Sequence, residues 1–100
     1  MLRITTDNTD RECLLKLEGC LCGPWVMEVA VCWLNEATAS PRRPVRVDLS
    51  DVFHVDRAGR ELITLMYRAG VRFVASGFVI PELVTQIAEA VDSERRSEPC

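Results

Sequence analysis

The sequence predicts an α/β protein with one mixed sheet of about four strands and three main helices, in the order β-β-α-β-α-β-α. Two observations lead to this fold class. Residues 45–49 alternate between apolar and polar side chains, which is the period of a strand with one buried face. Segments of this kind alternate with runs that have helical apolar spacing, so we expect parallel strand pairs after a first hairpin.

The first half of the chain is predicted to hold two strands and one helix. Strands over Leu2–Thr5 and Cys13–Glu18 flank a turn cluster at residues 7–10, which is typical of a hairpin. A helix begins at Pro24, a residue suited to the first helical position, and runs to about Ala39. Because apolar side chains almost encircle this helix, we expect it to be well buried. A surface kept apolar for a partner is the alternative.

The second half is predicted to hold two strands and two helices. The strands cover Val45–Leu49 and Val71–Ser76, and the helices cover about Arg57–Ala69 and the segment from Pro81 onward. We expect loops at residues 50–55 and 77–80, and Gly70 is suited to the residue that follows a helix.

Composition limits the function classes. The formal charge of −3 argues against nucleic acid as the main ligand. The residues through Asp10 are polar and acidic, unlike a signal peptide, and the apolar run Trp25–Leu34 is too short to span a bilayer. We therefore expect a cytoplasmic protein with no membrane association. Its 100 residues fit one domain, predicted over residues 1–92, with a charged, frayed tail over 93–100.

The five cysteines do not predict a redox or metal site. Cys20 and Cys22 form C-x-C, whereas redox and zinc sites typically use C-x-x-C. With one histidine in the chain, a zinc site would need distant cysteines to converge. We therefore expect ordinary reduced thiols, and neither a metal nor a cofactor.

The strand at residues 45–49 and the helix after it organise the rest of the chain. Asp56 stands where the N-cap of that helix should be. A helix start presents unpaired N–H groups and the positive end of the helix dipole. A functional site is therefore expected there. His54, the only histidine, has no nucleophile and orienting group nearby in the sequence, so we do not expect an enzyme.

Most of the chain, about residues 2–92, resembles a STAS domain, the sulfate-transporter and anti-sigma-factor-antagonist family. The stretches that carry the resemblance are "LKLEGCLCGPWVMEVAVCWLNEA" and "VRVDLSDVFHVDRAGRELITLMYRAGVRFVASG". Within the second, Asp56 and Gly59 of "VDRAG" occupy the place of the family's Asp-Ser-Ser-Gly or Asp-Ser-Ala-Gly motif. Each piece is common, but their order and spacing together are not.

The resemblance implies a protein–protein interaction module. In the bacterial antagonists, a partner kinase phosphorylates the Ser or Thr before the motif's Gly, and the added charge abolishes binding. Here Ala58 occupies that phospho-acceptor position, and it has no hydroxyl to modify. The implied partner is an anti-sigma factor or a histidine-kinase-like ATPase in a partner-switching pathway that regulates transcription.

The expected partner-binding residues lie from the end of the third strand to the exposed face of the second helix. They are Ser50, Asp51, Phe53, His54, Asp56, Arg57, Ala58, Arg60, Glu61 and Thr64. Two alternatives stay open. One is a homo-oligomeric scaffold, such as a homodimer, that uses the apolar first helix. The other is a small thiol-dependent redox enzyme built on Cys20, Cys22 or His54.

Overall fold

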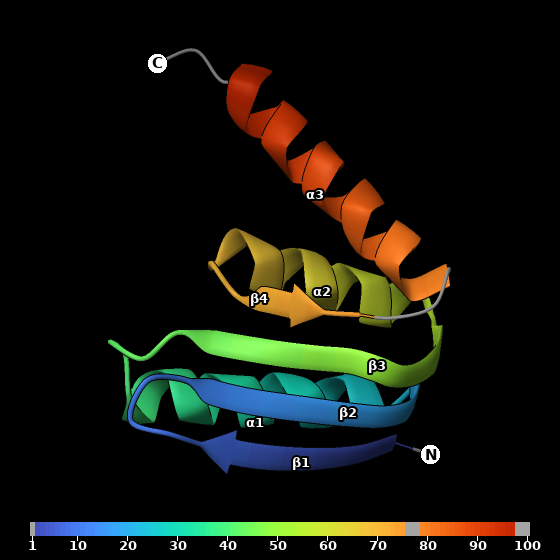
Figure 1. Cartoon of the computed structure of the whole chain (residues 1–100). Coiled ribbons are helices and arrows are strands. Elements are labelled where there is room, and N and C mark those ends of the chain that lie inside the picture. The colour runs from blue at the N-terminus through green and yellow to red at the C-terminus, as the bar shows by residue number, and fades with distance from the viewer. Residues whose placement is uncertain (1, 76–78, 98–100) are drawn as a thin grey trace.

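The computed structural model describes the backbone of residues 2–75 and 79–97. Its element order is β-β-α-β-α-β-α, which confirms the predicted order and the mixed four-stranded sheet (Figure 1). The elements are β1 Leu2–Asn8, β2 Cys13–Leu21, α1 Trp25–Ala39, β3 Val45–Val55, α2 Arg57–Arg68, β4 Arg72–Val74 and α3 Val79–Ser97.

The strands lie in the sheet in sequence order. β1 pairs with β2 antiparallel, whereas β2–β3 and β3–β4 are parallel pairs. Right-handed crossovers that move in one direction across a sheet place their helices on one face. Accordingly, α1 and α2 contact each other and lie behind the sheet in Figure 1, and α3 packs on α2 and β3.

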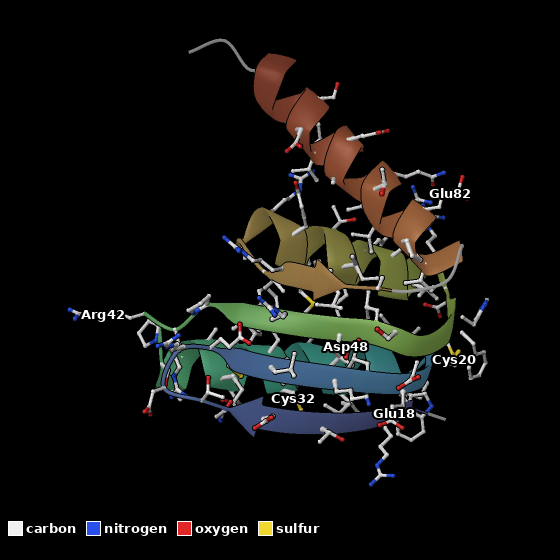
Figure 2. All side chains as sticks on the ribbon, in the orientation of Figure 1. Glu18, Cys20, Cys32, Arg42, Asp48 and Glu82 are labelled. Atoms are coloured by element: carbon white, nitrogen blue, oxygen red, sulfur yellow. A yellow bond between two sulfur atoms is a disulfide. The ribbon has the colours of Figure 1, made fainter. Side chains whose placement is uncertain are left out.

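The core lies between the sheet and the helices. Buried side chains alternate along β2 and β3, and α2 and α3 contribute the other wall. The largest fully buried side chains are Leu15, Leu17, Leu21, Val29, Val47, Leu49, Ile63 and Met66. Glu18 and Asp48 lie on the opposite face of the sheet, which no helix of Figure 1 covers (Figure 2).

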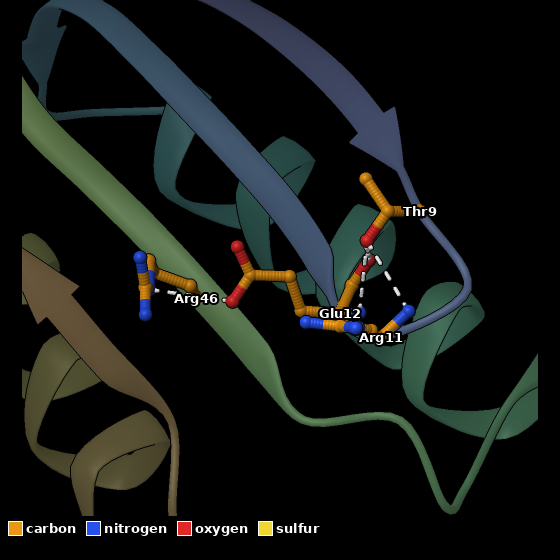
Figure 3. A network of polar contacts seen from close by, with 4 residues as sticks. All are labelled: Thr9, Arg11, Glu12 and Arg46. Atoms are coloured by element: carbon orange, nitrogen blue, oxygen red, sulfur yellow. Dashed lines mark hydrogen bonds and ion pairs between the residues drawn. The ribbon is translucent and has the colours of Figure 1, made fainter.

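A polar network closes the turn between β1 and β2 (Figure 3). The Thr9 Oγ1 atom accepts hydrogen bonds from the N–H groups of Arg11 (3.3 Å) and Glu12 (3.1 Å). The Glu12 carboxylate then pairs with Arg46 Nε on β3 at 3.5 Å. The turn therefore helps to set where β2 begins relative to β3.

The predicted loop at residues 50–55 is wrong, because β3 continues through Val55. β2 also extends beyond its predicted end, to Leu21, and pairs with β3 along this added length. Register shifts interrupt the pairing between Lys16 and Glu18 and between Gly19 and Cys20. These irregularities break the apolar–polar alternation that marks a strand in the sequence.

Three other boundaries differ from the expectation. β1 includes Asp7 and Asn8, which were expected in the turn, and β4 is limited to Arg72–Val74. α3 begins at Val79 and continues through Ser97, so most of the expected frayed tail is helical. The rest of that tail, residues 98–100, and the expected loop positions 77 and 78 lie outside the described residues.

The expectation that α1 is well buried is also wrong. Within α1 only Val29 is buried, whereas Met27, Val31 and Leu34 are 68%, 49% and 53% exposed. One face of α1 packs on the sheet. The α2–α3 pair covers a different part of the sheet and leaves the outer face of α1 open. The outer face of α1 therefore presents an apolar stripe to solvent.

Candidate functional site

The starts of α1 and α2 lie at the end of the sheet where the parallel strands β2 and β3 finish. β2 ends at Leu21 and α1 begins at Trp25, while β3 ends at Val55 and α2 begins at Arg57. Only Asp56 separates β3 from α2. In open α/β sheets, ligands usually bind outside the carboxyl ends of the parallel strands.

The Asp56 carboxylate links the two helix starts. Its Oδ1 atom accepts a hydrogen bond from the Gly59 N–H at 2.8 Å, and its Oδ2 atom accepts one from the Gly23 N–H at 2.9 Å. Asp56 is therefore the N-cap of α2, as the sequence predicts. The Gly23 N–H, followed by the Gly59 N–H, holds the pKa of Asp56 below its ordinary value because both bonds favour the ionised form.

We expect Asp56→Ala to lower the free energy of unfolding in a pH-dependent way. A carboxyl whose pKa is lower in the folded state stabilises the fold above its unfolded pKa, and this contribution disappears as pH falls through the folded pKa. The difference in the free energy of unfolding between wild type and variant should be largest at neutral pH and should shrink as the pH falls below about 4. Urea unfolding across pH 2–7 measures it.

The control for this measurement is Asp51→Ala. Asp51 is an exposed strand residue that forms an ion pair with Lys16 at 3.4 Å, and it caps no helix. An Asp56→Ala variant that matches Asp51→Ala at every pH would contradict the capping role.

Gly59 lets α2 approach β2 closely. A Cβ atom at this position would lie 2.5 Å from the Leu21 carbonyl oxygen and 2.9 Å from Val55 Cγ1. Because Gly59 does not have a positive φ, the position needs glycine for space and not for backbone conformation. The Leu21 carbonyl also accepts a hydrogen bond from the Asp56 N–H at 3.2 Å. The start of α2 therefore rests directly on the end of β2.

Among the described residues at this end of the sheet, Phe53 is the most exposed large apolar side chain. It is 75% exposed, although it lies in a strand. Beside it is a hollow of about 300 Å³ between the end of β3 and the first turns of α3. The hollow is lined by Phe53, His54, Val55, Ile80, Glu82, Leu83 and Gln86. Figure 2 shows Glu82 and Cys20 at this end of the molecule, with Arg42 at the other.

The predicted residues on α2 form one exposed surface with the end of β3. Arg57 and Ala58 are exposed in the first turn, and Arg57 Nε pairs with Glu61 Oε1 at 3.5 Å. Arg60 is exposed, and Thr64 Oγ1 donates a hydrogen bond to the Arg60 carbonyl at 2.8 Å. The Thr64 hydroxyl is thus engaged with its own helix.

Ser50 and Asp51 lie apart from this surface. They sit within β3, five or more residues before Asp56, and a strand rises about 3.3 Å per residue. The Ser50 N–H donates to Asp48 Oδ1 at 2.9 Å, and the hydrogen bonds from Ser50 lower the pKa of Asp48. Of the ten predicted partner-binding residues, the eight from Phe53 to Thr64 lie at the end of β3 and along the first two turns of α2, and six of these eight are exposed.

The expectation of ordinary reduced thiols is wrong for one cysteine pair. Cys20 and Cys22 form a disulfide at the end of β2. Cys13 and Cys32 are free, and burial followed by the neighbouring Glu36 carboxylate raises the pKa of the Cys13 thiol. The C-x-C spacing was the available signal for the pair, but the C-x-x-C pattern is the usual guide to redox sites.

Within residues 2–75 and 79–97, His, Cys, Asp and Glu side chains form no group of three that could hold a metal ion. No helix in the same described part of the chain has the length and apolar character needed to cross a membrane.

The architecture defines a class of protein: a small α/β module whose helices cover one face of a mixed four-stranded sheet. A similar solved structure is an uncharacterized protein of the DUF3478 family, with a SpoIIAA-like fold, from Shewanella loihica PV-4. The match has a TM-score of 0.55 and 14% sequence identity, and it covers 90% of this chain and 78% of that one. The fold is therefore SpoIIAA-like, the fold of STAS domains. No protein-family model and no curated protein matches the sequence.

Proposed function

We propose that this protein is a non-catalytic STAS-like interaction module of the anti-sigma-factor-antagonist type. It would act in the cytoplasm of a bacterium, in a partner-switching pathway that regulates transcription. Its partner would be an anti-sigma factor or a histidine-kinase-like ATPase. The SpoIIAA-like fold supports this proposal, and so does the exposed surface at the start of α2.

The docking surface in this proposal runs from the end of β3 to the second turn of α2. It consists of Phe53, His54, Asp56, Arg57, Ala58, Arg60, Glu61 and Thr64. The observation that carries the proposal is the exposed Phe53 beside the exposed helix start. A large aromatic side chain with an adjoining hollow is the kind of anchor that contributes most to protein–protein binding.

Ala58 makes this surface indifferent to the family's usual switch. It is exposed in the first turn of α2, directly before the buried Gly59. A phosphate at such a position would bring about −1.5 to −2 charges into the interface. Without a hydroxyl, the protein stays in the binding-competent state.

We expect Ala58→Ser to become a substrate of the partner kinase. Wild type and variant would each be incubated with ATP and with a partner of the proposed class, a histidine-kinase-like ATPase. Mass spectrometry of the 56–64 peptide should show one added phosphate in the variant and none in wild type. Ala39→Ser, which places a new exposed hydroxyl at the end of α1, is the control and should stay unmodified.

Two results would contradict the proposal. One is phosphate in the 56–64 peptide of the wild type. The other is a folded Ala58→Ser variant that binds the ATPase and is not modified. Absence of binding to any neighbouring kinase or anti-sigma factor would overturn the partner assignment itself.

A second candidate is a homo-oligomeric scaffold that uses α1. The exposed stripe of Met27, Val31 and Leu34 on this helix favours it, since surface stripes of this kind commonly mark interfaces. In that case the mass measured by sedimentation should rise with protein concentration, and Met27→Ala should reduce the rise. A monomer at all concentrations would exclude it.

A further inference from the structure

We propose that Cys20 and Cys22 form a redox-active pair whose disulfide is opened by low-molecular-weight thiols, and that opening it loosens the segment that supports the start of α2. The pair lies at the end of β2, next to the proposed docking surface. The proposal therefore adds a modification site and a form of regulation to that surface.

The disulfide lies where it can affect the start of α2. It brackets Leu21, whose carbonyl accepts the Asp56 N–H at 3.2 Å and lies directly under Gly59. Immediately after the pair, the Gly23 N–H donates to the Asp56 carboxylate at 2.9 Å. The backbone that the disulfide constrains therefore makes two hydrogen bonds to the N-cap of α2.

The disulfide closes a very short loop, because its cysteines are only two positions apart. Cross-links that close short loops restrict the unfolded chain much less than those that close long ones. Reduction should therefore leave the fold intact and change the local order of the segment. Such a pair is suited to a local switch rather than to holding the fold together.

Access to the two sulfur atoms is unequal. Cys20 is 8% exposed, whereas Cys22 is half-buried and is followed by the exposed Gly23. Thiol–disulfide exchange depends on access to the sulfur that is attacked. Attack is therefore expected at Cys22 Sγ.

The exchange has two steps. A thiolate attacks Cys22 Sγ, forms a mixed disulfide and breaks the bond to Cys20, which leaves as a thiolate. A second thiolate attacks the small-molecule sulfur of the mixed disulfide and releases Cys22 as a thiolate. The two thiols supply two electrons and become a disulfide, and the cysteine thiolates take up two protons. The proposal rests on the proposed function in one respect, the location in the cytoplasm. Disulfides in that compartment are usually transient or redox-sensing.

The test uses the purified chain in glutathione buffers that range from mostly oxidised to mostly reduced. Free thiols are alkylated and located by mass spectrometry, and amide hydrogen exchange is measured on the same samples. In oxidised buffer Cys20 and Cys22 should resist alkylation, and in reduced buffer both should react. The amides of Gly23 and Asp56 should then exchange about tenfold faster.

Two controls separate a local effect from unfolding. The Val71 N–H, which donates to the Met66 carbonyl at 3.0 Å after the end of α2, should exchange at the same rate in both buffers. The variant Cys20→Ser/Cys22→Ser should show the fast exchange in every buffer, whereas Cys32→Ser should behave as wild type. If the double variant does not fold, the wild type reduced with dithiothreitol gives the same comparison.

The proposal is overturned if both cysteines are alkylated in oxidised buffer, or if the pair stays closed in reduced buffer. It is also overturned if the Gly23 and Asp56 amides exchange at one rate in both. All of these measurements are made on the purified chain without a protein partner. A failure to bind a kinase or anti-sigma factor would therefore contradict the proposed function alone, and unchanged exchange would contradict this proposal alone.

Discussion

Gly59→Ala is expected to destabilise the protein by roughly 3 kcal/mol, the upper end of the usual range for overpacking, because the new Cβ atom meets backbone. The new Cβ atom would lie 2.5 Å from the Leu21 carbonyl oxygen and 3.0 Å from Leu21 Cγ. The carbonyl is backbone in β2, where Leu21 pairs with Val55 of β3, so relief requires α2 to shift away from the sheet. Urea unfolding at neutral pH measures the loss.

Gly70 provides the matched control. It has φ = 93° after α2, and nothing lies within 4 Å of a Cβ built there. Gly70→Ala should therefore cost roughly 1–2 kcal/mol through backbone conformation alone. Asn tolerates the left-handed region better than Ala, so Gly70→Asn should recover part of the loss. Gly59→Asn should recover nothing, because it adds volume. Equal losses at both glycines would contradict the steric explanation.

The start of α2 could be predicted because its signals are local. Asp56 is a strong N-cap type, and the structure gives it the expected hydrogen bond from the Gly59 N–H at 2.8 Å. The apolar spacing predicts an inner stripe of Leu62, Leu65, Met66 and Ala69, and this is only half right: Leu62 and Met66 are buried, whereas Leu65 and Ala69 are exposed. Neither inference needs to know what the helix packs against.

The length of β3 could not be predicted, because it depends on its neighbour. In a regular strand with one buried face, polar and apolar side chains alternate. Residues 50–55 do not follow this alternation strictly. They stay in the sheet because β2 pairs with them along this length, with two shifts in register. A single sequence does not reveal such shifts. The expected loop was therefore a strand. The disulfide between Cys20 and Cys22 lies at this same end of β2, and it was missed because the C-x-C spacing is not the usual redox pattern.

The exposed stripe on α1 is a case where composition misled. An almost entirely apolar helix is usually a buried one. In a domain of 100 residues, however, one sheet face and one helix pair leave the outer side of α1 uncovered. Which side faces solvent follows from tertiary packing, and the helical spacing of the apolar residues does not specify it.

Phe53→Ala should weaken binding to the partner by about thirtyfold, which corresponds to roughly 2 kcal/mol, the size of a typical hot-spot residue. Phe53 is 75% exposed in the free protein, so its truncation removes little buried area and should leave the unfolding midpoint almost unchanged. In a complex, the ring and the hollow beside it would lose their water together. Titration calorimetry with a partner of the proposed class, a histidine-kinase-like ATPase, measures the affinity.

Met27→Ala is the matched control for this measurement, because Met27 is 68% exposed but lies on α1, away from the proposed surface. It should leave the affinity for the ATPase unchanged. If Met27→Ala weakens that binding and Phe53→Ala does not, the partner binds the stripe on α1 and the proposed docking surface is wrong. Losses in both variants would require a partner large enough to reach both helices. The pair of variants therefore decides which exposed apolar feature is the interface, since each removes one of them without disturbing the core.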